Sequence, residues 1–448
     1  MKDLTEGAIT GHLVRMAVPI GVGMVFQTLY YLVDLYFVAQ LGDIAIAGVS
    51  AAGSLQFLVM ALSQVLGVGT GALIAHAAGR KDREEANLIF NQSLGLAAVC
   101  AGLTLAGGYS LAGWYMQQLG ADAATALTGS QYLNWFLPGM ALQFALVSMG
   151  SALRGTGIVK PAILVQILTV LLNAMLCPIL ITGWLTGWPL GVVGAGLATS
   201  ISVGVGVVLM FFYFLRLERF VAFDFGLMRP RGPDWKRILA VGLPPGGEFA
   251  LMFVFIGVIY WTIRGFGPEA QAGYGIGQRV VQALILPAMA IAFATAPVAG
   301  QNMGAGKFER VRATFKTAMV MLVSIMLSLT LVFQVHPEAF IAFFTSEPQV
   351  IAAGAQFLRI ISFNFVAVGV VFTCSGLFQA MGNTLPALAA SASRLLSFAI
   401  PAVWLSSRPW FELHHLWYLS VATVALQAMI SWLLAIKEMN SRLAPNAA

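Results

Sequence analysis

The chain has 448 residues, of which 59% are hydrophobic and only 9% are charged. Soluble globular proteins carry about 25% charged residues, so this composition and a mean hydropathy of +0.85 indicate a membrane protein and exclude an ordinary soluble domain. The formal net charge of +6 is attributed to membrane topology, because no basic patch alternates with aromatic residues as a nucleic-acid site would.

Twelve apolar runs are long enough to cross a bilayer, since a transmembrane helix needs about 20 mostly apolar residues. The segment before the first run carries acids and lacks a small-residue cleavage site, so it is interpreted as a tail and not as a signal peptide. The predicted spans are 13–39, 47–77, 85–114, 125–150, 160–182, 192–216, 237–263, 271–300, 310–335, 350–378, 386–406 and 414–436. The longest polar break is residues 217–236, which divide the spans six and six.

The two sets of six spans resemble each other at a constant offset of 225 residues. Pro19 matches Pro244 at this offset, and LGDIAIAG (41–48) matches FGPEAQAG (266–273). Because each set has an even number of spans, both sets enter the membrane from the same side and form a parallel repeat. We therefore expect an all-α integral membrane protein with an N-lobe (1–216), a cytoplasmic linker (217–236) and a C-lobe (237–448).

The orientation is predicted from lysine and arginine, which favour cytoplasmic loops. Most of them fall on the side of the N-terminus, including Arg80, Lys81 and the segment 307–316. Trp184 and Trp404 lie near the opposite ends of spans, as interfacial aromatic residues do. Both termini are therefore expected in the cytoplasm.

Two acids lie well inside predicted spans: Asp34 in the first and Glu248 in the seventh. A charge at the bilayer centre costs roughly 2.5–3.5 kcal/mol on insertion scales, and apolar surroundings favour the protonated form of a carboxyl group. Asp34 is predicted to alternate between protonated and ionised forms, as a transporter coupled to H⁺ or Na⁺ requires. The alternative is a structural acid that accepts hydrogen bonds from neighbouring helices.

The same two spans carry helix-disrupting residues at matched positions. Pro19 interrupts the first, and the seventh contains Pro244, Pro245 and Gly246. A matched pair of interrupted spans is typical of the moving, ligand-handling region of a transporter.

Polar residues on other spans are predicted to lie near Asp34. Gln27 precedes Asp34 by seven residues and shares its helical face. The fifth span has one polar face, formed by Gln166, Thr169 and Asn173. The sixth span contains Thr199, Ser200 and Ser202. These residues would form one cluster if the three spans meet, and the alternative for the hydroxyls is ordinary packing of small residues between helices.

The C-lobe offers a second set of candidates. Glu248 has three open roles: to bind a cationic substrate, to carry a proton, or to cap the broken backbone beside it. Arg279 in the eighth span is its candidate partner, either structurally or in substrate handling. Met252 belongs to a soft, aromatic stretch that suits varied apolar ligands. Arg394 is expected to extend along its helix to the inner face.

Signatures of catalysis and metal binding are missing from the sequence. It contains no phosphate-binding GxxxxGK[ST] loop. Its three cysteines, Cys100, Cys177 and Cys374, lie in separate apolar runs, and its histidines form no zinc-type cluster. Neither an enzyme nor a metal site nor a cofactor other than a coupling ion is expected.

Several longer stretches together resemble the multidrug and toxic compound extrusion (MATE) family over essentially the whole length. They are VDLYFVAQLG (33–42), GTGIVKPA (155–162), LLNAMLCP (171–178), GLPPGGEFALMF (242–253), VAGQNMGAGKFERVR (298–312) and MGNTLPA (381–387). The overall pattern is more similar to the prokaryotic DNA-damage-inducible-F-like branch than to the eukaryotic one.

The resemblance implies two six-helix lobes around a central cavity, and export of organic compounds in exchange for H⁺ or Na⁺. Asp34 matches the first-helix acid implicated in ion coupling, and Asn173 matches an asparagine of the family. Where the family often has aspartate before a proline, this chain has Cys177 before Pro178. Loss of that carboxylate disfavours Na⁺, because a hard cation prefers several oxygen ligands.

The sequence therefore predicts a monomeric secondary antiporter in the cytoplasmic membrane of a prokaryote. It would export small organic, cationic and lipophilic compounds in exchange for H⁺ at Asp34, with Na⁺ as the less favoured ion and membrane lipid as its surroundings. The alternative is a lipid or glycolipid flippase of related architecture, which should carry more cationic residues in its spans to hold a pyrophosphate group. A channel is a further alternative, although the two-lobed repeat with buried acids favours alternating access.

Overall fold

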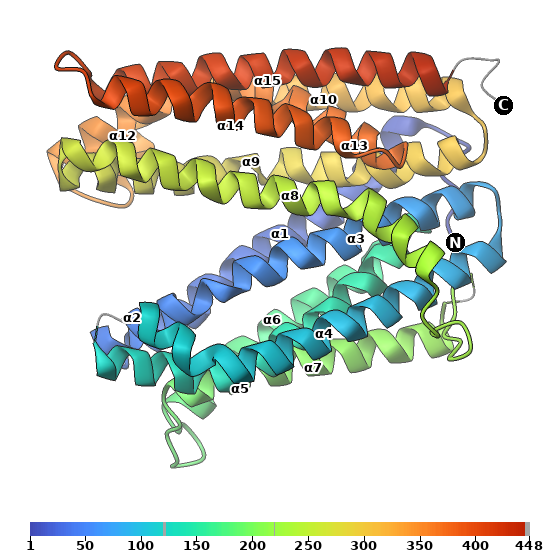
Figure 1. The fold of residues 1–448 in the computed structure, drawn as a ribbon, viewed down its shortest axis with the longest axis horizontal. Coiled ribbons are helices and arrows are strands. Elements are labelled where there is room, and N and C mark those ends of the chain that lie inside the picture. Colours follow the sequence, from blue (N-terminus) through green and yellow to red (C-terminus); the bar gives the residue numbers. More distant parts are fainter. Residues whose placement is uncertain (120–121, 219, 444–448) are drawn as a thin grey trace. The chain divides into compact units, whose positions relative to one another are not determined.

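The computed structural model describes residues 1–119, 122–218 and 220–443. These residues form α-helices joined by short turns, with one short 3₁₀ helix and no strand among them (Figure 1). Eleven of the described helical segments are long and apolar enough to cross a membrane, and a bent pair adds a twelfth. The all-α membrane architecture expected from hydropathy is thus confirmed. The chain folds into two compact units.

The first unit comprises Met1–Asp3 and Pro19–Gly246. Its helices are α1 (Ile9–Ala39), α2 (Asp43–Gly53), α3 (Leu55–Gly79), α4 (Arg83–Leu119), α5 (Ala123–Gly155), α6 (Lys160–Ile181), α7 (Val192–Arg216) and the start of α8 (Gly232–Ile263). The most buried span is α5, which packs against α2, α3, α4 and α7. Glycines allow this packing: a Cβ on Gly48 of α2 would lie 2.9 Å from the backbone nitrogen of Gly129 in α5.

The second unit comprises Leu4–Val18 and the chain from Gly247 onward. It holds the rest of α8, the 3₁₀ helix η1 (Arg264–Phe266), α9 (Pro268–Gly304), α10 (Phe308–Val335), α11 (Pro337–Ala342), α12 (Pro348–Ile361), α13 (Asn364–Ala380), α14 (Leu385–Ser406) and α15 (Leu413–Arg442). Helix α9 packs against α10, α12 and α13. Aromatic rings join it to α15, where Tyr274 stacks on Trp417 with ring centroids 5.4 Å apart.

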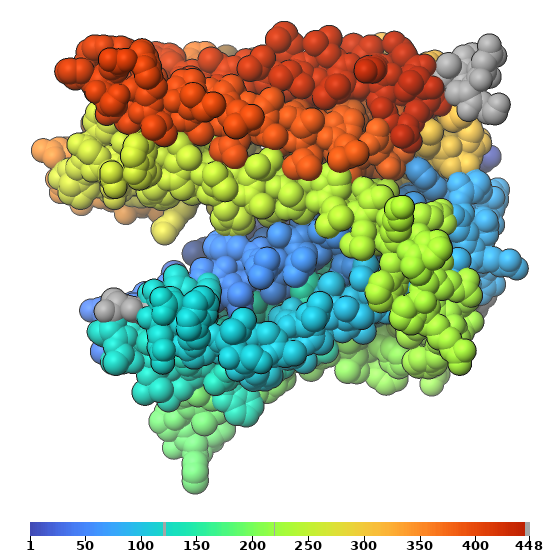
Figure 2. Space-filling model, viewed as in Figure 1, coloured from blue at the N-terminus to red at the C-terminus, as the bar shows by residue number. Residues whose placement is uncertain are grey.

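One surface of the second unit is formed by α14 and α15, drawn in orange and red in Figure 2. Its exposed side chains are large and apolar, among them Leu396, Ile400, Met429 and Leu433. A soluble protein would not expose so continuous an apolar surface. This surface is therefore the kind that contacts lipid.

The units exchange the beginnings of their first helices. Residues Leu4–Val18 pack with the second unit, where the backbone nitrogen of Leu4 donates to Gln301 Oε1 at 3.0 Å. Residues 237–246, the start of α8, pack with the first unit, where Arg237 donates to Glu85 at 2.6 Å. The unit boundaries therefore differ from the expected lobes 1–216 and 237–448, because hydropathy marks a span without indicating the helices it packs against.

The segment expected as a cytoplasmic linker is hydrogen-bonded to α4. Gln92 Nε2 donates to the carbonyls of Leu227 and Arg229, at 2.5 and 2.7 Å. Its Oε1 accepts from the backbone nitrogen of Arg231 at 3.0 Å. Asn91 forms a similar pair of bonds with Ala222 and Asp224. Both amide side chains are fully buried, so residues 222–231 are part of the first unit.

Candidate functional site

Polar side chains from α1, α6 and α7 lie around Asp34 in the first unit. On α1 and α6 they are spaced three, four or seven residues apart, which places them on one helical face. We call this set the N-lobe cluster, and its members are Gln27, Tyr30, Asp34, Gln166, Asn173, Cys177 and Thr199. Of the residues expected at the ion-coupling site, the structure brings together Asp34, Asn173 and Thr199. Gln27 instead bonds to Gln166, about two turns from Asp34 on α1.

Hydrogen bonds connect the three helices. The Tyr30 hydroxyl donates to Thr199 Oγ1 at 2.8 Å, and Asn173 Nδ2 donates to the same oxygen at 3.4 Å. Gln166 Nε2 donates to Gln27 Oε1 at 2.9 Å. Neutral hydroxyls and amides thus join α1 to α6 and α7 inside the unit.

Asp34 has a weak partner. Its Oδ1 lies 3.8 Å from Cys177 Sγ, which also lies 3.5 Å from Asn173 Oδ1. A thiol has one weak donor, so it satisfies only one of these oxygens at a time. Within the described ranges, Asp34 forms no ion pair. The carboxyl group can therefore gain or lose a proton without breaking a salt bridge.

Position 177 faces Asp34 across the cluster. An aspartate at this position would place a second carboxylate beside the first, whereas Cys177 supplies sulfur. Sulfur is a soft ligand and suits alkali cations poorly. No group of three or more His, Cys, Asp or Glu side chains able to hold a metal ion occurs in the part of the chain that the structure describes.

The hydroxyls of α7 have different environments. Ser200 donates to the carbonyl of Trp135 at 2.5 Å and accepts from the backbone nitrogen of Gly139 at 2.9 Å, so it fills the interruption that Pro138 makes in α5. Ser202 donates to the carbonyl of Ala198 in its own helix. Both hydroxyls are structural, whereas Thr199 belongs to the cluster.

Tyr30 is the cluster residue that the sequence interpretation missed. An aromatic residue in a span was counted as apolar, although its hydroxyl needs a partner in the bilayer. Tyr30 precedes Asp34 by four residues and so lies on the same face of α1. Helical spacing from Asp34 is the signal that would have identified it.

In the second unit, Glu248 has only neutral hydrogen-bonding neighbours among the described residues. Ser391 Oγ on α14 donates to Glu248 Oε2 at 3.4 Å, and Gln427 Nε2 on α15 donates to the same hydroxyl at 3.2 Å. Glu248 is half-buried, and Gln427 is buried. This arrangement leaves the carboxylate without a cation among the described residues.

The other candidates of the second unit are not gathered at Glu248. Arg279 is exposed on α9, while its neighbours Gly277 and Val280 are buried, and no ion pair joins it to Glu248 within the described chain. Met252 follows Glu248 by one turn of α8 and is 45% exposed. Arg394 does not extend to the end of its helix as expected: its guanidinium lies over the ring of Phe255, 4.3 Å from the centroid.

Comparison with known proteins identifies the family. The family model MatE matches residues 19–179 and, separately, residues 244–405. The chain belongs to the MatE family. The two matches begin 225 residues apart, at Pro19 and Pro244, which confirms the internal repeat.

Two similar proteins are named as probable multidrug resistance proteins. A probable multidrug resistance protein, YpnP, of Bacillus subtilis (strain 168) is 26% identical over 423 residues, covering 93% of this chain and 90% of that protein. A probable multidrug resistance protein, NorM, of Thermotoga maritima is 27% identical over 383 residues, covering 84% and 81%. A solved MOP superfamily transporter from Pyrococcus furiosus superposes with a TM-score of 0.89 at 25% identity, covering 98% of each chain. The chain is therefore a multi-pass membrane protein of a multidrug efflux transporter family, which is not a class of enzymes.

The matched prolines of this MATE protein lie where the chain passes between its units. The second unit ends its first segment at Val18, directly before Pro19. On α8, a Cβ at Gly246 would lie 2.5 Å from Val65 of the first unit, and one at Gly247 would lie 3.1 Å from Leu388 of the second. Pro19, Pro244, Pro245 and Gly246 thus fall at the two crossings, within helices α1 and α8 that continue through them.

Proposed function

We propose that this protein is a secondary antiporter that exports organic, cationic and lipophilic compounds in exchange for H⁺, and that Asp34 carries the proton. The observation that supports this proposal most is the environment of Asp34: a carboxyl group inside a membrane span, with a thiol as its near partner and no salt bridge among described residues. An acid so placed in a transporter is a functional candidate by default.

The proposed coupling follows from charge. Ionised Asp34 favours the state that binds substrate, and protonation removes a buried charge and favours the state that releases it. The N-lobe cluster then loses a charge while Tyr30, Thr199 and Asn173 keep their neutral hydrogen bonds. Because substrate and proton favour different charge states of one group, the binding of each weakens the binding of the other.

Na⁺ is the less favoured coupling ion. A hard cation is bound best by several oxygens, and in this chain Cys177 places sulfur next to Asp34. A proton needs a single basic oxygen. The cluster therefore suits proton exchange better than Na⁺ binding.

In the second unit, Glu248 is a candidate group for the cationic end of a substrate. Among the side chains of the described residues, only the Ser391 hydroxyl forms a hydrogen bond with its carboxylate. The exposed thioether of Met252 one turn away offers an adaptable apolar contact. The names of the relatives as multidrug resistance proteins agree with a substrate range of this kind.

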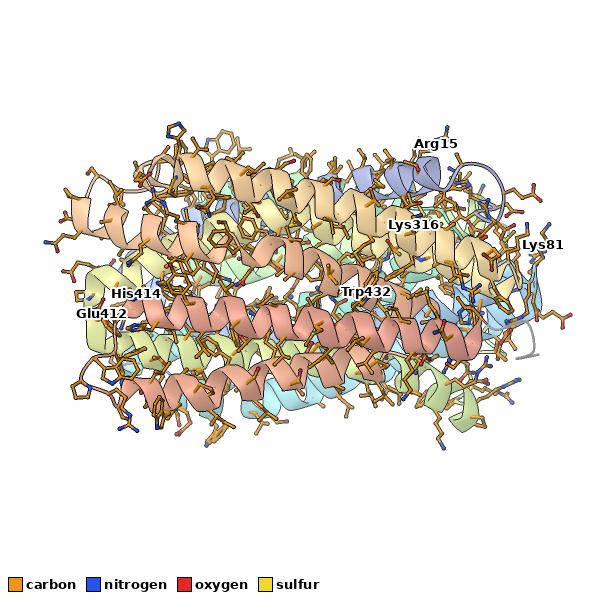
Figure 3. All side chains as sticks on the ribbon, turned by 90° about the horizontal axis from the view of Figure 1, so that it is seen from above. Arg15, Lys81, Lys316, Glu412, His414 and Trp432 are labelled. Carbon is orange, nitrogen blue, oxygen red and sulfur yellow. The ribbon has the colours of Figure 1, made fainter. Side chains whose placement is uncertain are left out.

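We place the protein in the cytoplasmic membrane of a prokaryote as a monomer with both termini in the cytoplasm. Figure 3 shows Arg15 and Lys316 toward one end of the second unit and Glu412 and His414 at the opposite end. Basic residues favour the cytoplasmic side, so the end with Arg15 and Lys316 would face the cytoplasm.

The test is efflux of ethidium from proteoliposomes under an imposed pH gradient or an imposed Na⁺ gradient. The expected result is efflux driven by the pH gradient alone, and its loss in Asp34→Asn. Asp43→Asn is the matched control, because Asp43 is an exposed acid at the start of α2 and lies outside the cluster. Efflux that follows Na⁺, or that survives in Asp34→Asn, would show that the proton is not carried by Asp34.

A further inference from the structure

Helix α14 carries a cation that has no anionic partner. Arg394 lies near the middle of this 22-residue helix, and its Nε is buried without a hydrogen-bond partner in the described structure. None of the ion pairs among the described residues includes it. Its guanidinium lies over the ring of Phe255 on α8, 4.3 Å from the centroid.

The Phe255 ring satisfies only one face of the guanidinium. Arginine stays charged in proteins and presents five donors in one plane, while a ring stacked on that plane accepts none of these in-plane hydrogen bonds. A planar fork of donors fits a carboxylate or a phosphate. Among the described residues, the half-buried guanidinium of Arg394 therefore lacks the planar acceptor that its geometry suits.

A lipid headgroup is a poor candidate for that acceptor. With a rise of about 1.5 Å per residue, the middle of α14 lies more than about 10 Å from either helix end. Arg394 is held there by Phe255, which also contacts Phe398 of α14 with ring centroids 4.5 Å apart. The acceptor must therefore come to the middle of the helix, as a transported molecule does.

An acid and an aromatic surface lie along the same pair of helices. Glu248 and Phe255 are seven residues apart on α8, so they share a face and lie about 10 Å apart along the axis. On α14, Ser391 contacts Glu248 and Arg394 contacts Phe255. This face presents a carboxylate at Glu248 and, about two turns further along α8, an aromatic ring with a guanidinium stacked on it.

We propose that Arg394 binds an anionic group of the transported molecule, so that the α8–α14 face accepts zwitterionic aromatic amphiphiles as well as simple cations. The cationic end would bind at Glu248, the rings would pack against Phe255, and a carboxylate or phosphate would accept hydrogen bonds from Arg394. This assignment rests on the proposed function as an exporter of small organic molecules, and it adds an anionic group to the substrate class.

The test uses two dyes that share one ring system. Rhodamine 6G is an ethyl ester with one positive charge, and rhodamine 19 is its free acid, a zwitterion. Equilibrium binding of both dyes to the purified protein is measured by fluorescence polarisation. In Arg394→Gln we expect the affinity for rhodamine 19 to fall about tenfold, the scale of one lost charge-assisted hydrogen-bonding pair. The affinity for rhodamine 6G should stay within about twofold, because the ester offers no carboxylate to bind.

Two further variants separate binding from structure. Arg408→Gln removes an exposed guanidinium, two residues beyond the end of α14, that lies 4.3 Å from the centroid of the Trp404 ring. This variant should change neither affinity. Arg394→Lys keeps the charge without the planar fork and should retain part of the preference for rhodamine 19. If Arg394→Gln does not fold, the comparison of Arg394→Lys with the native chain decides the question, since a purely structural arginine would change both dyes alike.

The outcomes are distinct from those of the antiport proposal. Equal weakening of both dyes in Arg394→Gln, no change for rhodamine 19, or a native chain that does not bind rhodamine 19 would each overturn the assignment of Arg394. Binding needs no gradient, so a native chain that binds rhodamine 19 but fails to export ethidium would leave this assignment standing and contradict the transport mechanism instead.

Discussion

Cys177 is the residue that most distinguishes the proposed ion-coupling site. Its sulfur lies between Asp34 and Asn173, at 3.8 and 3.5 Å from their oxygens. The side chain at this position thus decides whether Asp34 has a thiol or a second carboxylate as its neighbour. The choice bears on the coupling ion, because two adjacent carboxylates hold a cation or share a proton.

Changing Cys177 should change the ion that drives transport. In Cys177→Asp a second carboxylate faces Asp34, so we expect a Na⁺ gradient to drive ethidium efflux that the native chain does not show. Cys177→Ser is the control, since a serine adds an oxygen without a charge, and it should stay driven by protons. The measurement is efflux under separate Na⁺ and pH gradients. If Cys177→Asp responds to Na⁺ no better than Cys177→Ser does, the role given to position 177 is wrong.

Single residues of the site were predictable where burial cost and helical spacing act together. Asp34 was identified because a carboxylate inside an apolar span carries a free-energy cost. Gln27 and Asn173 were identified because their helical spacing placed them on polar faces. Tyr30 was missed because tyrosine counts as an apolar residue in a hydropathy profile, although its hydroxyl is polar. The position of Arg394 over Phe255 was not predictable, since it depends on how α8 and α14 pack.

At the level of helices, the crossing of α3 and α8 shows how close packing depends on glycine. A Cβ at Gly242 would lie 1.9 Å from the carbonyl oxygen of Val65, and one at Gly69 would lie 2.3 Å from that of Ile238. Backbone atoms cannot yield as a flexible side chain can. Of the glycines in the stretch 67–71, Gly69 faces α8, whereas Gly67 and Gly71 face α5. Small residues commonly allow such close packing of membrane helices.

A methyl group at this crossing should destabilise the first unit. Gly242→Ala should lower the free energy of unfolding by about 1–3 kcal/mol, the usual cost of overpacking, or more because the obstacle is backbone. Gly257→Ala on the same helix is the control: its Cβ would meet nothing within 4 Å, so its effect should be small. The measurement is the thermal unfolding midpoint of each purified variant. Equal midpoints for the two variants would contradict the packing described for Gly242.

The helices themselves were predictable, and their partners were not. Twelve apolar runs predicted the spans because length and hydropathy are local properties of a sequence. Hydropathy does not record which neighbour a helix contacts. Hydropathy therefore could not predict that Leu4–Val18 pack with the second unit and the start of α8 with the first. The matched prolines nevertheless mark the places where the chain changes units.

At the level of the whole molecule, a parallel repeat accounts for two units with corresponding parts. The same family model matches both halves, at residues 19–179 and 244–405. The halves have diverged in chemistry: the first unit holds Asp34 among neutral amides and hydroxyls, and the second holds Glu248 and Arg394 along α8 and α14. We infer that the proton is handled in the first unit and the ends of the substrate in the second.

At the scale of the whole transporter, the carboxyl group of Asp34 is proposed to link substrate binding to proton binding. If a proton on Asp34 weakens substrate binding, then substrate binding must equally weaken proton binding, so adding substrate should release protons. The direct measurement is the proton released when rhodamine 6G is added to purified protein in weakly buffered solution, followed with a pH indicator. About one proton per bound dye should be released in the native chain and in Asp43→Asn, and none in Asp34→Asn. Proton release that persists in Asp34→Asn, or is absent from the native chain while the dye binds, would contradict it.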